Sequence, residues 1–100
     1  MDETALSQNG ILIRLPEERW MHIINRHAIL TDKKQLLLDA IIYPDRILAG
    51  NEGALMAVRE FEPGRWLVVV YREEVNDGFI ITAFPTRRIN SLNRRQQLWP

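Results

Sequence analysis

The order of apolar and polar residues predicts two helices in the first half of the chain. Over residues 16–28, apolar positions recur every three or four residues, which is the period of an amphipathic α-helix. Pro16 suits the first helical position, since its missing N–H would have no intrahelical partner there. A second apolar segment begins at Asp32 and must end before Pro44. We expect Asp32 to cap this second helix, with Gln35 completing a capping box.

Apolar runs in the second half of the chain predict β-strands joined by tight turns. The candidate strands cover residues 46–49, 54–61, 65–72 and 78–85. The segments between them carry turn-forming Gly, Asn and Pro residues, and Asn-Asp-Gly at 76–78 is a typical hairpin signal. Three such turns place the four strands antiparallel to one another. The pattern therefore predicts an α+β domain in which two N-terminal helices pack on a four-stranded antiparallel β-meander.

The two ends of this pattern leave alternatives open. Residues 11–15 form a short apolar run that is typical of an edge strand, and residues 89–98 fit either a short C-terminal helix or an extended tail. Residues 67–71 and 79–84 are apolar at nearly every position, so both faces of the sheet should be covered. The two helices cover one face. The other face then needs the tail, a second copy of the chain in a homodimer, or a partner protein.

Length and composition narrow the class of protein. A chain of 100 residues is long enough for one core but not for two, so residues 1–100 should form a single domain. The absence of cysteine excludes disulfides, thiolate metal sites and cysteine nucleophiles. No apolar run approaches the ~18 residues of a membrane span, and the acidic start is unlike a signal peptide. We therefore expect a cytoplasmic protein without membrane contact.

Overall neutrality hides an uneven distribution of charge. Thirteen basic and thirteen acidic residues cancel, but eleven of the basic ones are arginine, the residue suited to forked recognition of phosphates and carboxylates. Residues 79–100 contain no acidic residue and four arginines: Arg87, Arg88, Arg94 and Arg95. A basic C-terminal end of this kind suits a phosphate ligand, although an ordinary arginine-rich surface has the same composition.

Residue type and spacing exclude several classes of chemistry. The two histidines, His22 and His27, would lie about 140° apart around a regular helix, so they cannot share a metal ion. The serines lie near the ends of the chain, outside any nucleophile-elbow setting, and no strand–glycine–helix sequence forms a phosphate loop. We therefore expect neither a metal nor another cofactor.

Three side chains stand out against the pattern around them. His27 continues the apolar stripe of the first helix, either as a core-edge histidine bonded to the backbone or as a general acid/base facing a cleft. Arg59 lies in an otherwise apolar row of its strand, either as a charge guarding a sheet edge or as a phosphate ligand. Thr82 is expected on the strand face of Ile80 and Phe84, either as an ordinary buried threonine or as a hydroxyl aimed at a phosphate.

These groups fit metal-independent RNA cleavage. In this reaction the substrate's own 2′-OH attacks the phosphate, so the protein supplies proton transfer and cationic stabilisation rather than a nucleophile. The catalytic candidates are His27 as general acid/base, Arg59 and Arg87 as phosphate ligands, and Thr82 as a positioning group. RNA contacts are expected from four further side chains: Arg26, Arg88, Arg94 and Tyr71, the last by stacking on a base.

Four segments, in this order, resemble one nuclease superfamily. RWMHIINRH (19–27), LLLDAIIYPDRIL (36–48), RWLVVVY (65–71) and IITAFPTRR (80–88) are similar to motifs of the phage-type members of the barnase–EndoU–colicin–RelE superfamily. The resemblance implies two helices followed by a four-stranded antiparallel sheet, and a small metal-independent ribonuclease of the toxin type. By this resemblance, His27 matches the histidine of the helix motif and Thr82 the threonine of the last strand.

The resemblance also implies partners and leaves one role open. Such ribonucleases act on RNA and occur in toxin–antitoxin modules, so an antitoxin or immunity protein is an expected partner. A glutamate general base of the barnase kind on a central strand is missing, and Glu60 is a weak substitute for it. The general base is therefore unassigned. The alternative function is a catalytically inactive RNA- or protein-binding domain on the same scaffold.

Overall fold

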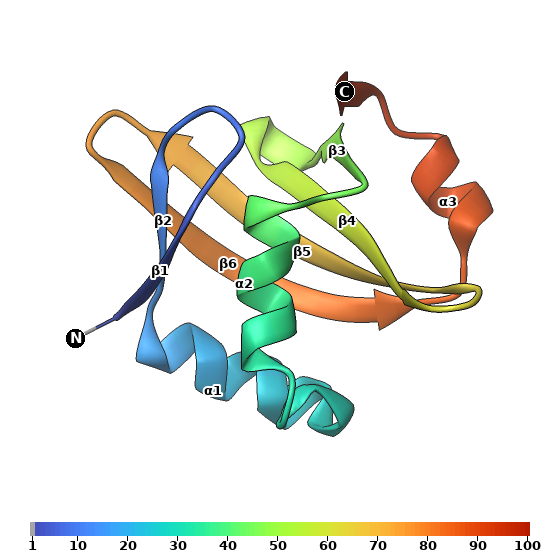
Figure 1. Ribbon diagram of the computed structural model, residues 1–100, viewed down its shortest axis with the longest axis horizontal. Helices are drawn as coiled ribbons and strands as arrows, with labels where there is room; N and C mark the ends of the chain where they lie inside the picture. The colour runs from blue at the N-terminus through green and yellow to red at the C-terminus, as the bar shows by residue number, and fades with distance from the viewer. Residues whose placement is uncertain (1) are drawn as a thin grey trace.

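A seven-stranded mixed sheet forms the centre of the protein, and two helices cover one of its faces (Figure 1). The computed structural model describes residues 2–100. The strands are β1 (Glu3–Leu6), β2 (Leu12–Leu15), β3 (Arg46–Ala49), β4 (Leu55–Glu62), β5 (Arg65–Glu74), β6 (Asp77–Thr86) and β7 (Gln97–Trp99). The helices are α1 (Glu17–Arg26), α2 (Lys34–Ile42) and α3 (Ile89–Asn93), with the 3₁₀ turns η1 (Ala28–Leu30) and η2 (Asn51–Gly53).

The strand order is β1-β2-β6-β5-β4-β3-β7, so the prediction of a four-stranded antiparallel meander with two N-terminal helices is wrong. The four predicted strands are present as β3 to β6, close to their predicted bounds. However, the hairpin β1–β2 extends the sheet beside β6, and β7 extends it beside β3. β2 lies parallel to β6, a pairing that requires a long crossover connection and that no hairpin turn can signal.

The larger core lies between the helices and one sheet face, which we call the helix face. α1 contributes Trp20 and Ile23 to this core, and α2 contributes Leu37, Leu38 and Ile41. α2 crosses in front of the strands in Figure 1. The predicted stripe of α1 thus does become buried, because burying an amphipathic face is the main source of stability for short helices.

The predicted capping box at the start of α2 is wrong. α2 begins one residue later than a cap at Asp32 would require, with Lys33 at the N-cap position and no side-chain cap. Asp32 instead accepts a bond from its neighbour, since Lys33 Nζ lies 3.0 Å from its carboxylate. The η1 turn decides this start, because Lys33 N–H donates to the Leu30 carbonyl and so continues η1 rather than the helix.

The opposite sheet face, which we call the open face, is covered in part by the end of the chain. A smaller core on this face joins Leu48, Met56, Val58 and Val68 to Leu92 of α3. Residues 89–98 were expected to form a helix or a tail, and they form both α3 and most of β7. The tail is therefore the covering that the apolar strands required over part of this face. None of the helices within residues 2–100 is long and apolar enough to cross a membrane.

A β-bulge in β6 changes which side chains lie on the open face. Tyr71 pairs with Ile80 and Val70 pairs with Thr82, so Ile81 is an extra residue in β6. Alternation alone would place Ile80 and Thr82 on one face, and the prediction that they share a face is wrong. Ile80 is buried in the helix-face core, whereas Thr82 lies opposite Val70 on the open face. A single inserted residue has this effect because side chains along a strand alternate with a period of two.

Candidate functional site

The open face carries a cleft of about 410 Å³ next to α3, which we call the β-face cleft. Its floor is apolar and consists of Met56, Val70 and Phe84, on three adjacent strands. Its rim is polar and comes from η2, from β5, from β6 and from the segment after α3. The lining residues are Gly50, Asn51, Glu52, Ala54, Met56, Val70, Arg72, Ile81, Thr82, Phe84 and Arg95.

Two arginines on the cleft rim lack a carboxylate partner. Arg72 Nη1 donates to the Glu52 carbonyl at 2.9 Å. Arg95 Nη1 donates to the Ala49 carbonyl at 3.1 Å, and both of its terminal nitrogens lie 3.2 Å from Asn51 Oδ1. Within residues 2–100, no acidic side chain lies at ion-pair distance from either guanidinium. Neither guanidinium therefore forms an ion pair, and each arginine keeps N–H donors for an anion.

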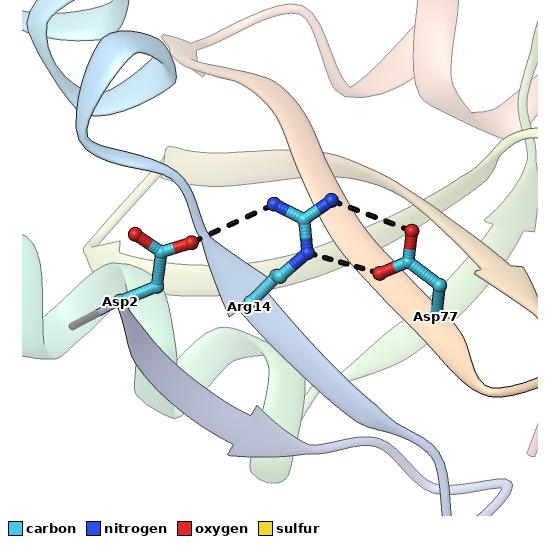
Figure 2. A network of polar contacts seen from close by, with 3 residues as sticks. All are labelled: Asp2, Arg14 and Asp77. Atoms are coloured by element: carbon cyan, nitrogen blue, oxygen red, sulfur yellow. Dashed lines mark hydrogen bonds and ion pairs between the residues drawn. The ribbon is translucent and has the colours of Figure 1, made fainter.

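Arg14, in contrast, forms ion pairs with two carboxylates. Figure 2 shows its guanidinium between Asp2 and Asp77. Its Nε lies 2.9 Å from Asp77 Oδ1, and its Nη1 lies 3.5 Å from Asp2 Oδ2. The same guanidinium lies 5.5 Å from the centre of the Phe79 ring. Arg14 thus joins β2 to the ends of its neighbouring strands, and the arginines of the β-face cleft have no comparable contacts with carboxylates.

The η2 turn that forms one rim of the cleft has a strained backbone. Glu52 has φ 55° and ψ 39°, in the left-handed region that is rare for residues other than glycine. The turn is tight, because Gly50 N–H donates to the Ala54 carbonyl at 2.8 Å and a Cβ on Gly50 would lie 2.9 Å from that oxygen. Arg72 and Arg95 both bond to carbonyls or side chains of this turn. Strained turns of this kind concentrate at functional sites.

His27 and Arg59 lie on the helix side of the sheet, away from the β-face cleft. His27 is the half-buried C-cap of α1, and its N–H donates to the Ile23 carbonyl at 2.8 Å. Arg59 shares its strand face with Ala57, and its Nη1 donates to the Tyr43 carbonyl at the end of α2, at 2.7 Å. A cation bonded to the last carbonyls of a helix stabilises that helix end. The sheet therefore separates these two residues from Thr82.

Three of the other predicted RNA-binding or catalytic residues surround α3. Arg87 and Arg88 are exposed between β6 and α3, and Arg94 is exposed directly after α3, next to Arg95. None of these three arginines is among the residues that line the β-face cleft. Arg26 is exposed in the last turn of α1, at the same helix end as His27.

Tyr71 lies in the helix-face core, with none of its surface exposed. Its hydroxyl is buried without a hydrogen-bond partner among the described residues. Burial raises the pKa of this hydroxyl, and the charge of Glu73 raises it further. The predicted stacking of Tyr71 on a nucleobase is therefore not possible in this conformation, because its ring cannot be reached from solvent.

Arg72 was not predicted as a site residue, and Arg95 was predicted only as part of the basic C-terminal end. The sequence does contain a signal for Arg72. Strand alternation places Arg72 on the same face as Val70, where its charge interrupts a row of apolar side chains. No local signal could have found Arg95, since only the fold brings the segment after α3 to η2.

The described part of the chain gives no further guide to a ligand. Among residues 2–100, no three histidine or acidic side chains gather as they would around a metal ion. The acidic residue on the cleft rim is Glu52. No protein-family model matches this chain, and no curated protein or solved structure matches it either.

Proposed function

We propose that the protein is a metal-independent endoribonuclease that binds a substrate phosphate in the β-face cleft. The observation that carries this proposal is the pair Arg72 and Arg95, two guanidinium groups without carboxylate partners on the rim of one cleft. Phosphate oxygens accept forked hydrogen bonds from guanidinium groups and supply the missing negative charge. Thr82 adds a hydroxyl on the same rim, and the apolar floor is suited to a base or sugar.

In the proposed reaction, the attacking oxygen and the leaving oxygen both belong to the RNA, and the protein and water only exchange protons with them. The 2′-oxygen forms a bond to phosphorus while the bond from phosphorus to the 5′-oxygen breaks, which leaves a 2′,3′-cyclic phosphate and a 5′-hydroxyl. The 2′-OH gives up its proton to a base, and the 5′-oxygen takes a proton from water. Negative charge on the phosphate oxygens grows in the transition state, so fixed guanidinium groups lower the barrier.

Glu52 is the lining residue that can accept the proton of the 2′-OH. His27, which the sequence analysis favoured for this role, lies on the other side of the sheet from Thr82. The proposal therefore keeps Thr82 and the chemistry of the sequence analysis, and it replaces His27 and Arg59 by Glu52, Arg72 and Arg95. Arg88 and Arg94 are exposed at the two ends of α3, and we propose them as RNA contacts outside the cleft.

Cleavage of purified RNA in EDTA tests this proposal. We expect wild-type protein to produce 2′,3′-cyclic phosphate ends, and Arg72→Gln or Arg95→Gln to lower the rate about a hundredfold, as for removal of one transition-state donor. Arg65→Gln is the matched control, because Arg65 lies on the same strand as Arg72 but pairs with Glu62 outside the cleft. No cleavage by wild-type protein at any concentration would refute the proposal.

A variant of His27 decides between the two placements of the site. If His27→Ala abolishes cleavage while Arg72→Gln cleaves at the wild-type rate, the reaction takes place at the end of α1 and the cleft assignment is wrong. We expect the reverse result. Glu52→Gln should lower the rate by about a hundredfold or more, because it keeps the shape of the turn and removes the base.

A catalytically inactive RNA- or protein-binding domain is the second candidate. The observation that favours it is the separation of His27 from the arginines of the cleft. Salt-dependent RNA binding without cleavage would support this candidate. A toxin role, with an acidic antitoxin or immunity protein on the same arginines in the cytoplasm, is part of the first proposal, and growth arrest on induction tests it.

A further inference from the structure

One hydrogen bond joins α1 to the backbone of β6 at Ile81, a residue that lines the β-face cleft. Arg19 is in the first turn of α1, and its Nε donates to the Ile81 carbonyl at 2.7 Å. Charged residues of an amphipathic helix ordinarily face solvent, but the Arg19 side chain is half-buried and reaches β6. Ile81 is the extra residue of the β-bulge and directly precedes Thr82.

The Ile81 carbonyl needs a donor from outside the strand ladders. β2 pairs with β6 only at Gly78 and Phe79, so residue 81 lies beyond that pairing. On the other side, the ladder with β5 passes from Ile80 to Thr82 without pairing Ile81. A partly buried backbone carbonyl without a partner is costly, and Arg19 removes this cost. The contact therefore favours the bulged form of β6 over a regular strand.

The bulge decides where the Thr82 side chain lies. In a regular strand that kept Ile80 in the helix-face core, residue 82 would also face that core. With the bulge, Thr82 lies opposite Val70 and lines the β-face cleft. Whatever stabilises the bulge thus places the hydroxyl on the same rim as the two arginines.

We propose that Arg19 is a positioning residue, which holds the β6 bulge through the Ile81 carbonyl and so places the Thr82 hydroxyl against an anion bound in the β-face cleft. This inference rests on the proposed function, since it takes the cleft to be the phosphate site. Arg19 itself does not touch the ligand. Its effect on binding must therefore act through Thr82 and must vanish when the Thr82 hydroxyl is absent.

A double-mutant cycle with uridine 3′-monophosphate as the probe tests this role. We expect Thr82→Val and Arg19→Met each to weaken nucleotide binding about five- to tenfold, which corresponds to one hydrogen bond to a charged group. The double variant should bind no more weakly than Thr82→Val alone, because coupled residues give non-additive losses. Arg19→Lys keeps a donor and should recover most of the affinity. Arg65→Met, which removes a guanidinium outside the cleft, is the control for nonspecific charge effects.

The results separate the positioning role from the proposed function. Additive losses in the double variant, or wild-type affinity in Arg19→Met, would overturn the positioning role. If Arg19→Met does not fold, Arg19→Gln completes the same cycle with an amide too short to reach β6. Wild-type protein that binds the nucleotide but does not cleave RNA would overturn the endoribonuclease proposal. The double-mutant cycle of nucleotide binding would then still test the positioning role of Arg19. Wild-type protein that binds no nucleotide would overturn the positioning role and the assignment of the cleft as the phosphate site, whereas the cleavage assay tests the endoribonuclease separately.

Discussion

Replacing Tyr71 by phenylalanine should stabilise the protein. The Tyr71 ring is 0% exposed in the helix-face core, and its hydroxyl lies there without a hydrogen-bond partner among residues 2–100. A buried polar group that has lost its water without gaining a partner costs about 1–3 kcal/mol. Phenylalanine keeps the ring and its contacts and removes only the oxygen. We therefore expect Tyr71→Phe to raise the free energy of unfolding by about 1–2 kcal/mol.

Urea denaturation at pH 7 measures this change, and the other tyrosine provides a matched control. Tyr43 is 66% exposed, so its hydroxyl is solvated in the folded and unfolded states and Tyr43→Phe should change stability by less than about 0.5 kcal/mol. A gain of about 1 kcal/mol in Tyr71→Phe would also raise the midpoint of thermal unfolding by roughly 4–8 °C in a domain of this size. A Tyr71→Phe variant that is less stable than wild type by about 1 kcal/mol or more would show that the hydroxyl is bonded, and would refute the reasoning.

The dependence of the free energy of unfolding on pH above about pH 10 is an independent test of the burial of the Tyr71 hydroxyl. The folded-state pKa of Tyr71 is raised above its unfolded value of 10.0, chiefly by burial. Because burial keeps the hydroxyl protonated in the folded state, the unfolded chain alone releases this proton between the two pKa values, and the free energy of unfolding falls as the pH rises above the unfolded pKa. Wild-type protein should therefore lose stability above about pH 10 relative to Tyr71→Phe. Equal slopes for the two proteins above pH 10 would contradict the burial of this hydroxyl.

Three further predictions concern the contacts around β2 and α1. Gly78→Ala should destabilise the protein by about 1–3 kcal/mol in urea denaturation, because a Cβ there would overlap a side chain of β2 and lie 2.8 Å from a backbone oxygen; stability equal to wild type would show that the parallel pair is looser than described. The Arg14 guanidinium lowers the pKa of Asp77 below 3.8, so the stability difference between wild type and Asp77→Asn should be present at neutral pH and disappear as the pH falls through this lowered pKa. The pKa of His22 is lowered by desolvation and by the charges of Arg19 and Arg26, so Arg19→Met should raise it while leaving it below 6.5, as NMR titration would show; an unchanged His22 pKa would contradict this account.

Local pattern was enough to identify most of the secondary structure. The four strands from Arg46 to Thr86 and the first two helices lie close to their predicted bounds, because a period of 3.6 or 2 in apolar residues is a property of neighbouring positions. Turn chemistry was also local, since a hairpin turn with a positive φ at Asn76 joins β5 to β6, although it lies at Val75 and Asn76 and the predicted turn residues Asp77 and Gly78 already pair with β5. These features depend on short stretches of chain, so the sequence shows them directly.

The same local reasoning failed wherever distant segments meet. The apolar run at 11–15 predicts a strand but not its neighbours, because the parallel pairing of β2 with β6 depends on a connection that runs through both helices and through β3 to β5. The sheet separates His27 from Thr82 for a related reason, because the motifs that contain these two residues do not indicate which face of the sheet each one occupies. Arg72 and Arg95 are separated in sequence and share a cleft only because α3 folds back over the open face.

The sequence by itself thus determined the first two helices and the four strands β3 to β6, and it set an arginine-rich, cysteine-free composition. The tertiary structure alone decided the strand order, the β6 bulge and the group of residues that lines the β-face cleft. The physical reason is that a one-residue shift in register moves a side chain to the other face of a sheet, and that register is set by contacts such as that of Arg19 with Ile81, far apart in the chain.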